Sequence, residues 1–380
     1  MRVVSLLGVT QILSWGTSYY LPAVLSHPIA RDTGWNSAIV VGGLSWALVV
    51  AAPLAPVVGR TIDRHGGRRV LALSSFLLAA GIALLGTASS IPVLYAAWTV
   101  IGLGMACGLY DPAFATLTRL YGASARPAIT GLTLLGGLAS TIGWPAVAAL
   151  EHKFGWRIAC FIIAGAHITV GSTIHLLLLP RPPEREPRPV EVSAAASEAT
   201  KPDRRFLYLV VAFTLFSCVS AGLSVNYLEV LRRLGIDPGT AVVIGMIIGP
   251  SQVAARIVEF TLGRGLHPLW TARGGMLLCM TGIALLAPSG PVLIVVATVI
   301  YGAGNGIMTI ARGTLPLALF GSAGYGARLG RMARPGVVAQ ALAPFALASA
   351  LDNWGPLAVL GGGLVLILLG LAALAQLRPT

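Results

Sequence analysis

The segment Gly59-Arg60-Thr61-Ile62-Asp63-Arg64-His65-Gly66-Gly67-Arg68-Arg69 lies between two long apolar runs. It brings four arginines and one aspartate together, whereas the residues before and after it are almost entirely apolar. Charged side chains are costly to insert into hydrocarbon, so such a segment belongs in water. We therefore interpret it as a loop at a membrane surface, with a membrane-spanning helix on either side.

The composition of the whole chain agrees with this interpretation. The chain has 380 residues, of which 56% are hydrophobic and 10% charged, and its mean hydropathy is +0.83. Soluble domains carry roughly 25% charged residues. The 46 glycines and 24 prolines are also compatible with packed membrane helices, where small residues let backbones approach closely. These properties exclude an ordinary soluble domain and predict an all-α membrane protein.

A helix of about 20 mostly apolar residues is long enough to cross the roughly 30 Å hydrocarbon core of a bilayer. Segments of this kind recur along the chain, and we predict twelve transmembrane helices. They cover residues 4–26, 37–58, 70–89, 92–117, 127–150, 158–179, 206–228, 239–262, 274–288, 291–311, 335–351 and 356–376. The ninth and eleventh segments are short, so their limits can shift by several residues.

The net charge of +13 follows the predicted topology. If the N-terminus is cytoplasmic, 20 of the 26 Lys and Arg residues fall in cytoplasmic segments, 5 in external segments, and Arg256 within a helix. Membrane proteins keep such an excess on the cytoplasmic side. The basic charge therefore indicates how the protein is oriented in the membrane. We expect no nucleic-acid partner. We expect a multi-pass protein of the inner membrane with both termini cytoplasmic.

A change of composition divides the chain near its middle. Residues 180–205 are rich in proline, charge and small residues, which cannot bury enough apolar surface to fold. We interpret them as a cytoplasmic linker between an N-terminal bundle, residues 1–179, and a C-terminal bundle, residues 206–380. Six predicted helices lie on each side of the linker.

The two halves also resemble each other in sequence. Residues 55–64 align with residues 255–264 at an offset of 200, and residues 101–122 align with residues 300–321 at an offset of 199. Two offsets that agree to one residue indicate a duplicated six-helix unit. Repeats of this kind, related by an axis along the membrane normal, occur in secondary transporters.

The order Gly-x-x-x-Asp-Arg-x-x-Gly-Arg-Arg in residues 59–69 resembles the loop between the second and third helices of the major facilitator superfamily. The twelve predicted helices, the central linker and the repeat are similar to that family over essentially the whole chain. The resemblance implies two pseudo-symmetric six-helix bundles and transport by alternating access. It also implies that the loop is a gate between conformations, formed by Gly59, Asp63, Arg64 and Arg68. Gly263 stands where the second copy would have an aspartate, so we expect a weaker gate there.

The family resemblance further implies that helices 1, 4, 7 and 10 line a central cavity. Polar and aromatic residues recur at helical spacing in two of them: Gln11, Trp15 and Tyr19 in the first, and Tyr301 and Asn305 in the tenth. Such side chains avoid lipid and turn toward protein or a wet cavity. We interpret these five as substrate-binding residues. The alternative is that they make ordinary hydrogen bonds between helices.

Arg256 is an ionisable residue inside the eighth predicted helix, with Gln252 and Glu259 on the same helix face. Its planar guanidinium suits a carboxylate or phosphate. An arginine here, with Trp15-Gly16 in the first helix and Gly34-Trp35 before the second, resembles the monocarboxylate and oxalate transporter branch. We therefore predict that Arg256 and Gln252 bind an anionic substrate. The alternative is a permanent ion pair between Arg256 and Glu259.

Asp111 and Glu259 are the candidates for proton coupling, because a carboxylate in a low-dielectric site can load and release a proton near neutral pH. For Asp111 the alternatives are a fixed salt bridge to Arg119 or Arg312 and a helix cap at the kink of Pro112.

Together these features predict a proton-coupled carrier of a small, carboxylate-like organic anion. The alternative is a proton-antiport exporter of drugs or metabolites. We expect no enzymatic activity, since no phosphate-binding loop occurs in the sequence. The scattered histidines have no metal-ligand spacing, so we expect no metal and no cofactor. We expect a monomer whose partners are the substrate, protons and the lipid bilayer.

Overall fold

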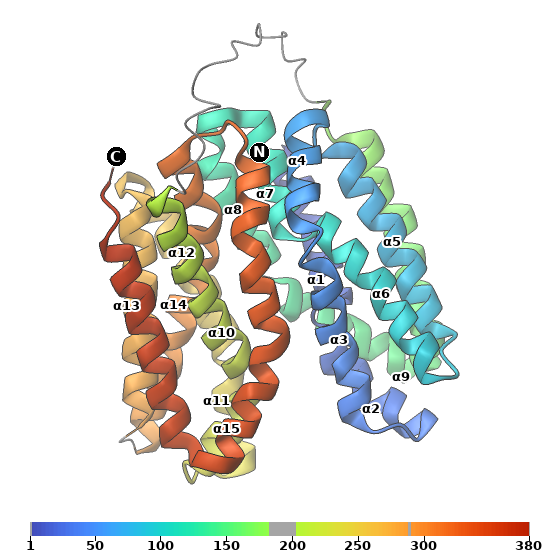
Figure 1. The fold of residues 1–380 in the computed structure, drawn as a ribbon. Coiled ribbons are helices and arrows are strands. Elements are labelled where there is room, and N and C mark those ends of the chain that lie inside the picture. Colours follow the sequence, from blue (N-terminus) through green and yellow to red (C-terminus); the bar gives the residue numbers. More distant parts are fainter. Residues whose placement is uncertain (1, 182–202, 288–289, 380) are drawn as a thin grey trace, which may run out of the picture.

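The computed structural model describes residues 2–181, 203–287 and 290–379. Within these ranges the chain is helical and contains no strand. The helices form two bundles that lie side by side (Figure 1). The expected linker, residues 180–205, falls almost entirely outside the described ranges. The proposed limits of the two domains therefore stay a prediction.

The first bundle crosses the membrane region six times, and most of its crossings are broken helices. Its elements are α1 (Arg2–Thr17), α2 (Pro22–Thr33), α3 (Ser37–Ala51), α4 (Ala55–His65), α5 (Arg68–Gly86), α6 (Ile91–Gly108), α7 (Tyr110–Tyr121), η1 (Gly122–Ala125), α8 (Arg126–Gly136), α9 (Ala139–Ala166), η2 (His167–Ser172) and η3 (Ile174–Leu178). The pairs α1–α2, α3–α4, α6–α7 and α8–α9 each make one crossing. The α9 helix turns back at Gly155, and η2 and η3 complete the sixth crossing.

The second bundle has longer, more continuous helices. Its elements are α10 (Arg204–Arg233), α11 (Pro238–Met246), α12 (Ile248–Leu262), η5 (Gly263–Gly265), α13 (Pro268–Leu286), α14 (Pro291–Phe320) and α15 (Tyr325–Ala375), which turns at Gly355. The eleventh crossing thus begins at Tyr325, ten residues before the predicted limit at 335. Arg328, Arg331 and Arg334, which lie before that predicted limit, belong to the first turns of α15.

When the helices of the described chain are judged one by one by length and hydropathy, fewer than twelve qualify as membrane spans. Seven segments are long and apolar enough, or eight if the α3–α4 pair, bent by 53°, is counted as one span. The segment Ile91–Leu178 contains three crossings and Tyr325–Ala375 contains two, while α1 and α2 are each too short to be counted. The broken architecture therefore explains the smaller number.

Three pairs of glycines, with one member in each bundle, have a positive backbone φ at corresponding positions of the repeat. Of the eight glycines with positive φ among the described residues, six form pairs at offsets of 199 to 201, namely Gly34 with Gly235, Gly122 with Gly321, and Gly155 with Gly355. A positive φ is easily adopted only by glycine. The duplication predicted from two sequence offsets therefore extends to the turns that join the helices.

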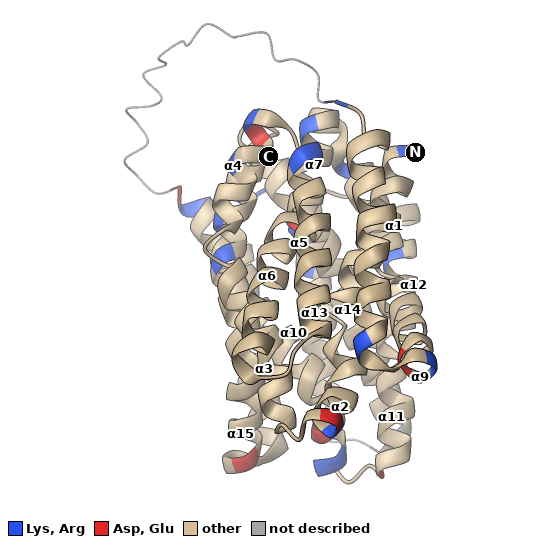
Figure 2. Cartoon of the chain, turned by 90° about the vertical axis from the view of Figure 1, so that its right-hand side faces the viewer, with Lys and Arg blue, Asp and Glu red and all other residues tan. Residues whose placement is uncertain are grey.

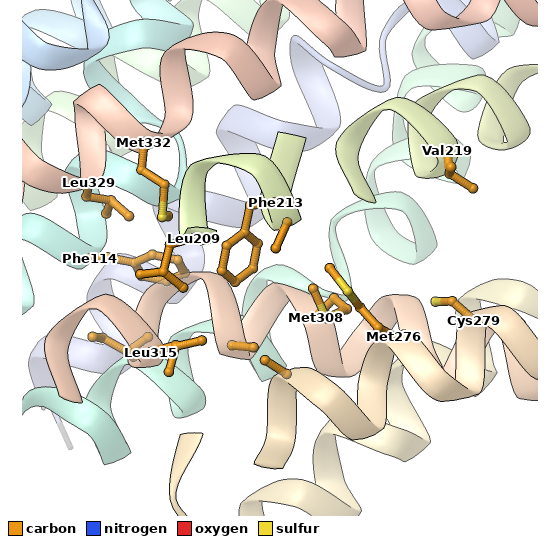
Figure 3. Packing of buried hydrophobic residues seen from close by; sticks show 14 of the residues in the cluster. Phe114, Leu209, Phe213, Val219, Met276, Cys279, Met308, Leu315, Leu329 and Met332 are labelled. Atoms are coloured by element: carbon orange, nitrogen blue, oxygen red, sulfur yellow. The ribbon is translucent and has the colours of Figure 1, made fainter. Parts of the chain in front are cut away.

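Both termini lie at one end of the molecule, which we call the termini face; the end that carries α2 and the α10–α11 turn is the distal face (Figure 1). Lys and Arg residues, coloured blue, are more frequent toward the termini face than at the distal face (Figure 2). The extensively packed pairs of elements that join the two bundles involve α3, α4, α7 and α8 on one side and α12, α14 and α15 on the other. Phe114 of α7 belongs to the same buried cluster as Leu315 of α14 and Leu329 of α15 (Figure 3).

Candidate functional site

Asp63 connects the two bundles at the termini face. Its carboxylate accepts hydrogen bonds from the backbone N–H groups of Gly326 and Ala327, each at 2.8 Å, in the first turn of α15. Free N–H groups and the helix dipole make a helix N-terminus a favourable place for a carboxylate. A Cβ on Gly59 would lie 2.0 Å from the carbonyl oxygen of Gly326, so only glycine permits this approach. Gly59 and Asp63 together hold α4 against α15.

The two other gate candidates in the charged loop have different surroundings. Arg64 is exposed. Arg68 donates to the carbonyl of Leu176 in η3, within its own bundle. That carbonyl lies in the last turn of η3, where the chain becomes extended at Leu179 and the backbone supplies no further helical donor. Arg68 therefore fastens the first bundle internally, and the contacts between bundles come from Gly59 and Asp63.

A second connection is related to the first by the internal repeat. Arg126 of α8 donates to the carbonyl of Gly263 at 3.1 Å and lies 3.6 Å from the carboxylate of Glu259. Positions 63 and 326 make the first connection, and the corresponding positions 263 and 126 make the second. At the position expected to carry a weaker gate, Gly263 accepts a hydrogen bond from Arg126 through its backbone carbonyl, and the carboxylate of Glu259, one turn earlier, forms an ion pair with the same arginine.

Asp111 forms a third connection between the bundles. Its Oδ2 lies 2.7 Å from the guanidinium of Arg312 on α14, and the two side chains are only 19% and 23% exposed. The sequence left open a fixed bridge to Arg119 or Arg312, and in this conformation the partner is Arg312. The other carboxylate oxygen of Asp111, Oδ1, is buried without a hydrogen bond from any described residue.

Arg256 lies between the bundles and is only 4% exposed. Its Nε donates to the carbonyl of Gly306 at 3.2 Å, and one terminal nitrogen donates to the carbonyl of Thr133 in the other bundle at 3.1 Å. The second terminal nitrogen donates to Gln252 Oε1 at 3.2 Å and to Thr309 Oγ1 at 3.4 Å. All four acceptors are uncharged. In the described part of the chain, this buried cation has no carboxylate within ion-pair distance.

Glu259 does not neutralise Arg256, although the two residues share a helix. Its carboxylate faces Arg126 and accepts a hydrogen bond from Thr271 Oγ1 at 3.0 Å. The alternative of a permanent Arg256–Glu259 pair is therefore wrong for this conformation. An i,i+3 contact would have cost Glu259 both of these partners.

Gln11 is buried with both ends of its amide in use. Its Nε2 donates to the carbonyl of Gly108 at 2.7 Å, and its Oε1 accepts from the indole N–H of Trp15 at 3.1 Å. The carbonyl of Gly108 is free because Pro112 cannot donate to it, which also explains the break between α6 and α7. Gln11 thus fixes the orientation of the Trp15 ring.

Trp15 belongs to a group of rings that we call the aromatic cluster: Trp15, Tyr19, Tyr20, Tyr110 and Trp144. The centroid of Trp15 lies 5.2 Å from Tyr19, 6.1 Å from Tyr20 and 5.0 Å from Tyr110. These spacings are typical of favourable ring pairs. The cluster gathers residues from α1, the α1–α2 break, α7 and α9 of the first bundle.

The aromatic cluster and Arg256 meet at one point of the backbone. A Cβ on Gly136 would lie 2.5 Å from the hydroxyl of Tyr110, and a Cβ on Gly137 would lie 2.0 Å from a terminal nitrogen of Arg256. These glycines stand at the break between α8 and α9. The rings of one bundle and the cation of the other therefore share a junction.

The two candidates on α14 lie deeper in the second bundle. Tyr301 is buried and stacks on Tyr227 with ring centroids 6.0 Å apart. Asn305 accepts a hydrogen bond from Ser220 of α10 at 2.9 Å. Asn305 is one helical turn from Thr309, which contacts Arg256. Asn305 is therefore the nearer of the two to the junction.

Sequence patterns missed several members of the junction. Thr133 and Gly306 contribute only backbone carbonyls, which carry no residue-type signal. Tyr20, Tyr110 and Trp144 lie on three separate elements, so helical spacing could not group them. Among the described residues, no cluster of His, Cys, Asp or Glu could hold a metal ion.

Two six-helix bundles that meet at a buried polar junction define the architecture of a secondary transporter. The chain belongs to the Major Facilitator Superfamily, whose family model matches residues 6–334. Its family and structural neighbours are transporters and not enzymes.

Relatives in sequence fall into two groups. Monocarboxylate transporter 11 from Homo sapiens is 33% identical over 168 residues, which is 42% of this chain and 33% of that protein. Chloramphenicol efflux pump MT0201 from Mycobacterium tuberculosis (strain CDC 1551 / Oshkosh) is 27% identical over 274 residues, which is 70% of this chain and 63% of that protein. The chain therefore spans less than two thirds of the length of these relatives.

Solved structures show the same fold at low sequence identity. The human organic anion transporter MFSD10 (TETRAN) superimposes with a TM-score of 0.76 and 16% identity, covering 98% of this chain and 99% of the other. The transporter FucP, in the outward conformation, also has a TM-score of 0.76, with 15% identity and 99% coverage of both chains.

Proposed function

We propose that this protein is a secondary active transporter that moves a small organic anion, carboxylate-like in its chemistry, by alternating access with proton coupling. We place it in the inner membrane as a monomer with both termini cytoplasmic, as the charge bias favours. The proposed bundles are residues 1–179 and 206–380, joined by a linker at 180–205. The main observation behind the proposal is that Arg256 is a buried cation whose described partners are all uncharged.

Arg256 is a buried cation whose described partners are all neutral oxygens. A buried charge without a counter-ion is costly, so a bound anion would stabilise this site. The guanidinium has five N–H groups and makes four contacts, and the two to Gln252 and Thr309 come from side chains that can rotate away. A carboxylate can take their place as a two-pronged acceptor. One uncompensated positive charge fits a monovalent anion.

Other residues have proposed roles around Arg256. Gln252 is a direct neighbour of the substrate carboxylate, and Trp15, Tyr19, Tyr301 and Asn305 line the cavity. Gln11 acts by holding Trp15. Gly59 and Asp63 form the gate, with Arg64 and Arg68 as the flanking charges of the same loop.

Proton coupling is assigned to Asp111 or Glu259. Each carboxylate faces an arginine of the opposite bundle, Arg312 and Arg126 respectively. These contacts lie among those that join the bundles, so opening the termini face would separate each acid from its cation. An unpaired carboxylate in a low-dielectric site favours its protonated form. The conformational change and proton binding would then be linked at the same residues.

Uptake into proteoliposomes tests the proposal. We expect labelled acetate, lactate or benzoate to accumulate under an inward proton gradient in wild type, and Arg256→Lys to reduce the rate at least about tenfold, because lysine loses the two-pronged contact. Arg232→Lys, an exposed arginine on α10, is the matched control and should retain wild-type uptake. Equal rates in wild type and Arg256→Lys would refute an anion site at Arg256.

The same vesicles test the coupling residues. Asp111→Asn and Glu259→Gln remove each acid with little change of shape, and at least one should abolish the dependence of uptake on the pH gradient. If both variants keep the full dependence, neither carboxylate carries the proton.

A second candidate function is export of drugs or metabolites by proton antiport. It is favoured by the aromatic cluster and by the similarity, over 70% of this chain, to a chloramphenicol efflux pump. Expression in a susceptible bacterium would then raise the inhibitory concentration of chloramphenicol, and Arg256→Lys would leave that resistance unchanged. No rise in resistance, together with carboxylate uptake, supports the first candidate.

A further inference from the structure

We infer that the preferred substrate is an aryl carboxylate, with its carboxylate on Arg256 and its ring against the aromatic cluster of the other bundle. The inference rests on the proposed function, because it names the class of anion for the same site. It does not follow from the presence of Arg256 alone, since an arginine would accept an alkyl carboxylate equally well.

The first argument is the position of the cluster relative to the cation. Tyr110 and Arg256 reach the adjacent glycines Gly136 and Gly137, so the edge of the cluster and the guanidinium are neighbours. Arg256 belongs to α12 of one bundle, whereas the rings belong to the other. A molecule with a carboxylate next to a ring would therefore contact both bundles at once. A substrate that links the bundles is what alternating access requires.

The second argument is that the rings are only partly covered by protein. Trp15, Tyr19, Tyr20 and Tyr110 are each half-buried, and Trp144 is 44% exposed. An open surface recess borders Trp144 and is lined by residues of α2 and α9, among them Val24 and Ser140. Its lining includes neither Arg256 nor the other rings, so the accessible surface of those rings comes from their own partial exposure. Part of the aromatic surface of the cluster is therefore not covered by protein.

The third argument concerns charge. Aromatic rings also attract cations through their negative faces. Here the guanidinium of Arg256 and the hydroxyl of Tyr110 lie against the adjacent glycines Gly137 and Gly136, and the positive charge of Arg256 repels a cationic ligand. An aromatic anion can pair with Arg256 and stack on the aromatic cluster, whereas an aromatic cation can interact favourably only with the rings.

The fourth argument is the fixed orientation of the central ring. Trp15 donates to Gln11, which is itself tied to the backbone of Gly108. A ring held in place loses little freedom when a ligand stacks on it. The site therefore has a preformed aromatic surface in the conformation described.

The test compares benzoate with cyclohexanecarboxylate, which have the same charge and a similar size but differ in aromaticity. Calorimetric titration of the purified wild-type protein should give a dissociation constant for benzoate roughly threefold to tenfold lower, as expected for one or two favourable ring contacts. Acetate should bind more weakly than both acids, and benzylamine, an aromatic cation, should not bind.

Variants locate the effect. In Trp15→Leu the ratio of the dissociation constants for cyclohexanecarboxylate and benzoate should fall to near one. Trp354 is 75% exposed and lies near the turn at Gly355, so Trp354→Leu should keep the wild-type ratio. Tyr110→Leu is the second variant if Trp15→Leu does not fold. Even if neither variant folds, the ratio of the two dissociation constants in the wild-type protein tests the preference for an aryl carboxylate.

The outcomes separate the two claims. If no carboxylate binds wild type, the proposed function and this inference both fall. If both acids bind with equal constants, the anion site stands and the aryl preference is overturned. If benzoate is preferred but Trp15→Leu and Tyr110→Leu both keep the preference, the ring is bound elsewhere and the inference is also overturned.

Discussion

Gln11 illustrates at the residue scale how one helix break leads to a structured site. Pro112 lacks the N–H that would bond to the carbonyl of Gly108, and Gln11 donates to that carbonyl instead. The other end of the amide then holds the indole of Trp15. Arg68 similarly donates to a free carbonyl at a helix end, that of Leu176 in the last turn of η3. Free carbonyls at helix breaks and helix ends thus determine where polar side chains are needed.

Replacing Gln11 with leucine tests this role. Gln11→Leu leaves the buried carbonyl of Gly108 and the N–H of Trp15 without partners, at a cost of about 1–3 kcal/mol for each unsatisfied group. We expect a lower free energy of unfolding in mixed micelles and weaker carboxylate binding. Gln376→Leu, at an exposed position near the end of the chain, should change neither quantity. Unchanged unfolding in Gln11→Leu would contradict the assigned hydrogen bonds.

At the element scale, the duplicated unit is clearest in its turns. Gly155 and Gly355 lie 200 residues apart, at φ 76°, ψ 160° and φ 77°, ψ 177°. Each reverses the chain between the last two crossings of its bundle. This region of backbone space is open almost only to glycine. Two positions with equal geometry should respond equally to substitution.

Alanine at either turn should therefore destabilise the protein by a similar amount. Nothing lies within 4 Å of a Cβ built at Gly155 or Gly355, so the penalty comes from the backbone alone and is of order 1–3 kcal/mol. Gly165→Ala is the control, since it has equal space and no positive φ. Apparent melting temperatures of the three purified variants provide the measurement. A Gly155→Ala or Gly355→Ala protein as stable as Gly165→Ala would count against the turn geometry.

For the whole molecule, three of the connections between the bundles lie toward the termini face (Figure 1). They are Asp63 with α15, Arg126 with Glu259 and Gly263, and Asp111 with Arg312. Arg256 adds a further connection through the carbonyl of Thr133, and α3 also packs on α15. We call this arrangement, with the bundles joined toward the termini face, the closed state.

A methyl group at Gly59 should shift the molecule away from this conformation. The added Cβ of Gly59→Ala would overlap the backbone of Gly326, and overpacking of this kind costs about 1–3 kcal/mol. That is roughly a fivefold to hundredfold loss of the closed state if the open state is unaffected. Spin labels at His65 and Arg331, both exposed, should then report longer distances than in wild type. Gly361→Ala, with nothing within 4 Å, should leave the distances unchanged.

Much of the fold followed from local properties of the sequence. The transmembrane crossings depend on the length of apolar runs, which can be counted along the chain. Their limits were less accurate where arginines occupy the first turns of a helix, as in α15. The identity of the candidate site was harder to predict, because Thr133 and Gly306 act through backbone carbonyls that any residue could supply.

Hydrophobicity, spacing and charge along the chain were enough to predict the membrane-embedded helical class, the duplicated unit, the excess of basic residues in cytoplasmic segments and an arginine within the eighth crossing. The ion-pair partners became known from the packing of the two bundles: Glu259 faces Arg126 rather than Arg256, and Asp111 faces Arg312. An acid at a helix surface can pair with a neighbour on its own helix or with a cation of the other bundle. Which of the two it contacts depends on how the bundles pack, and a local sequence pattern holds no information about that packing.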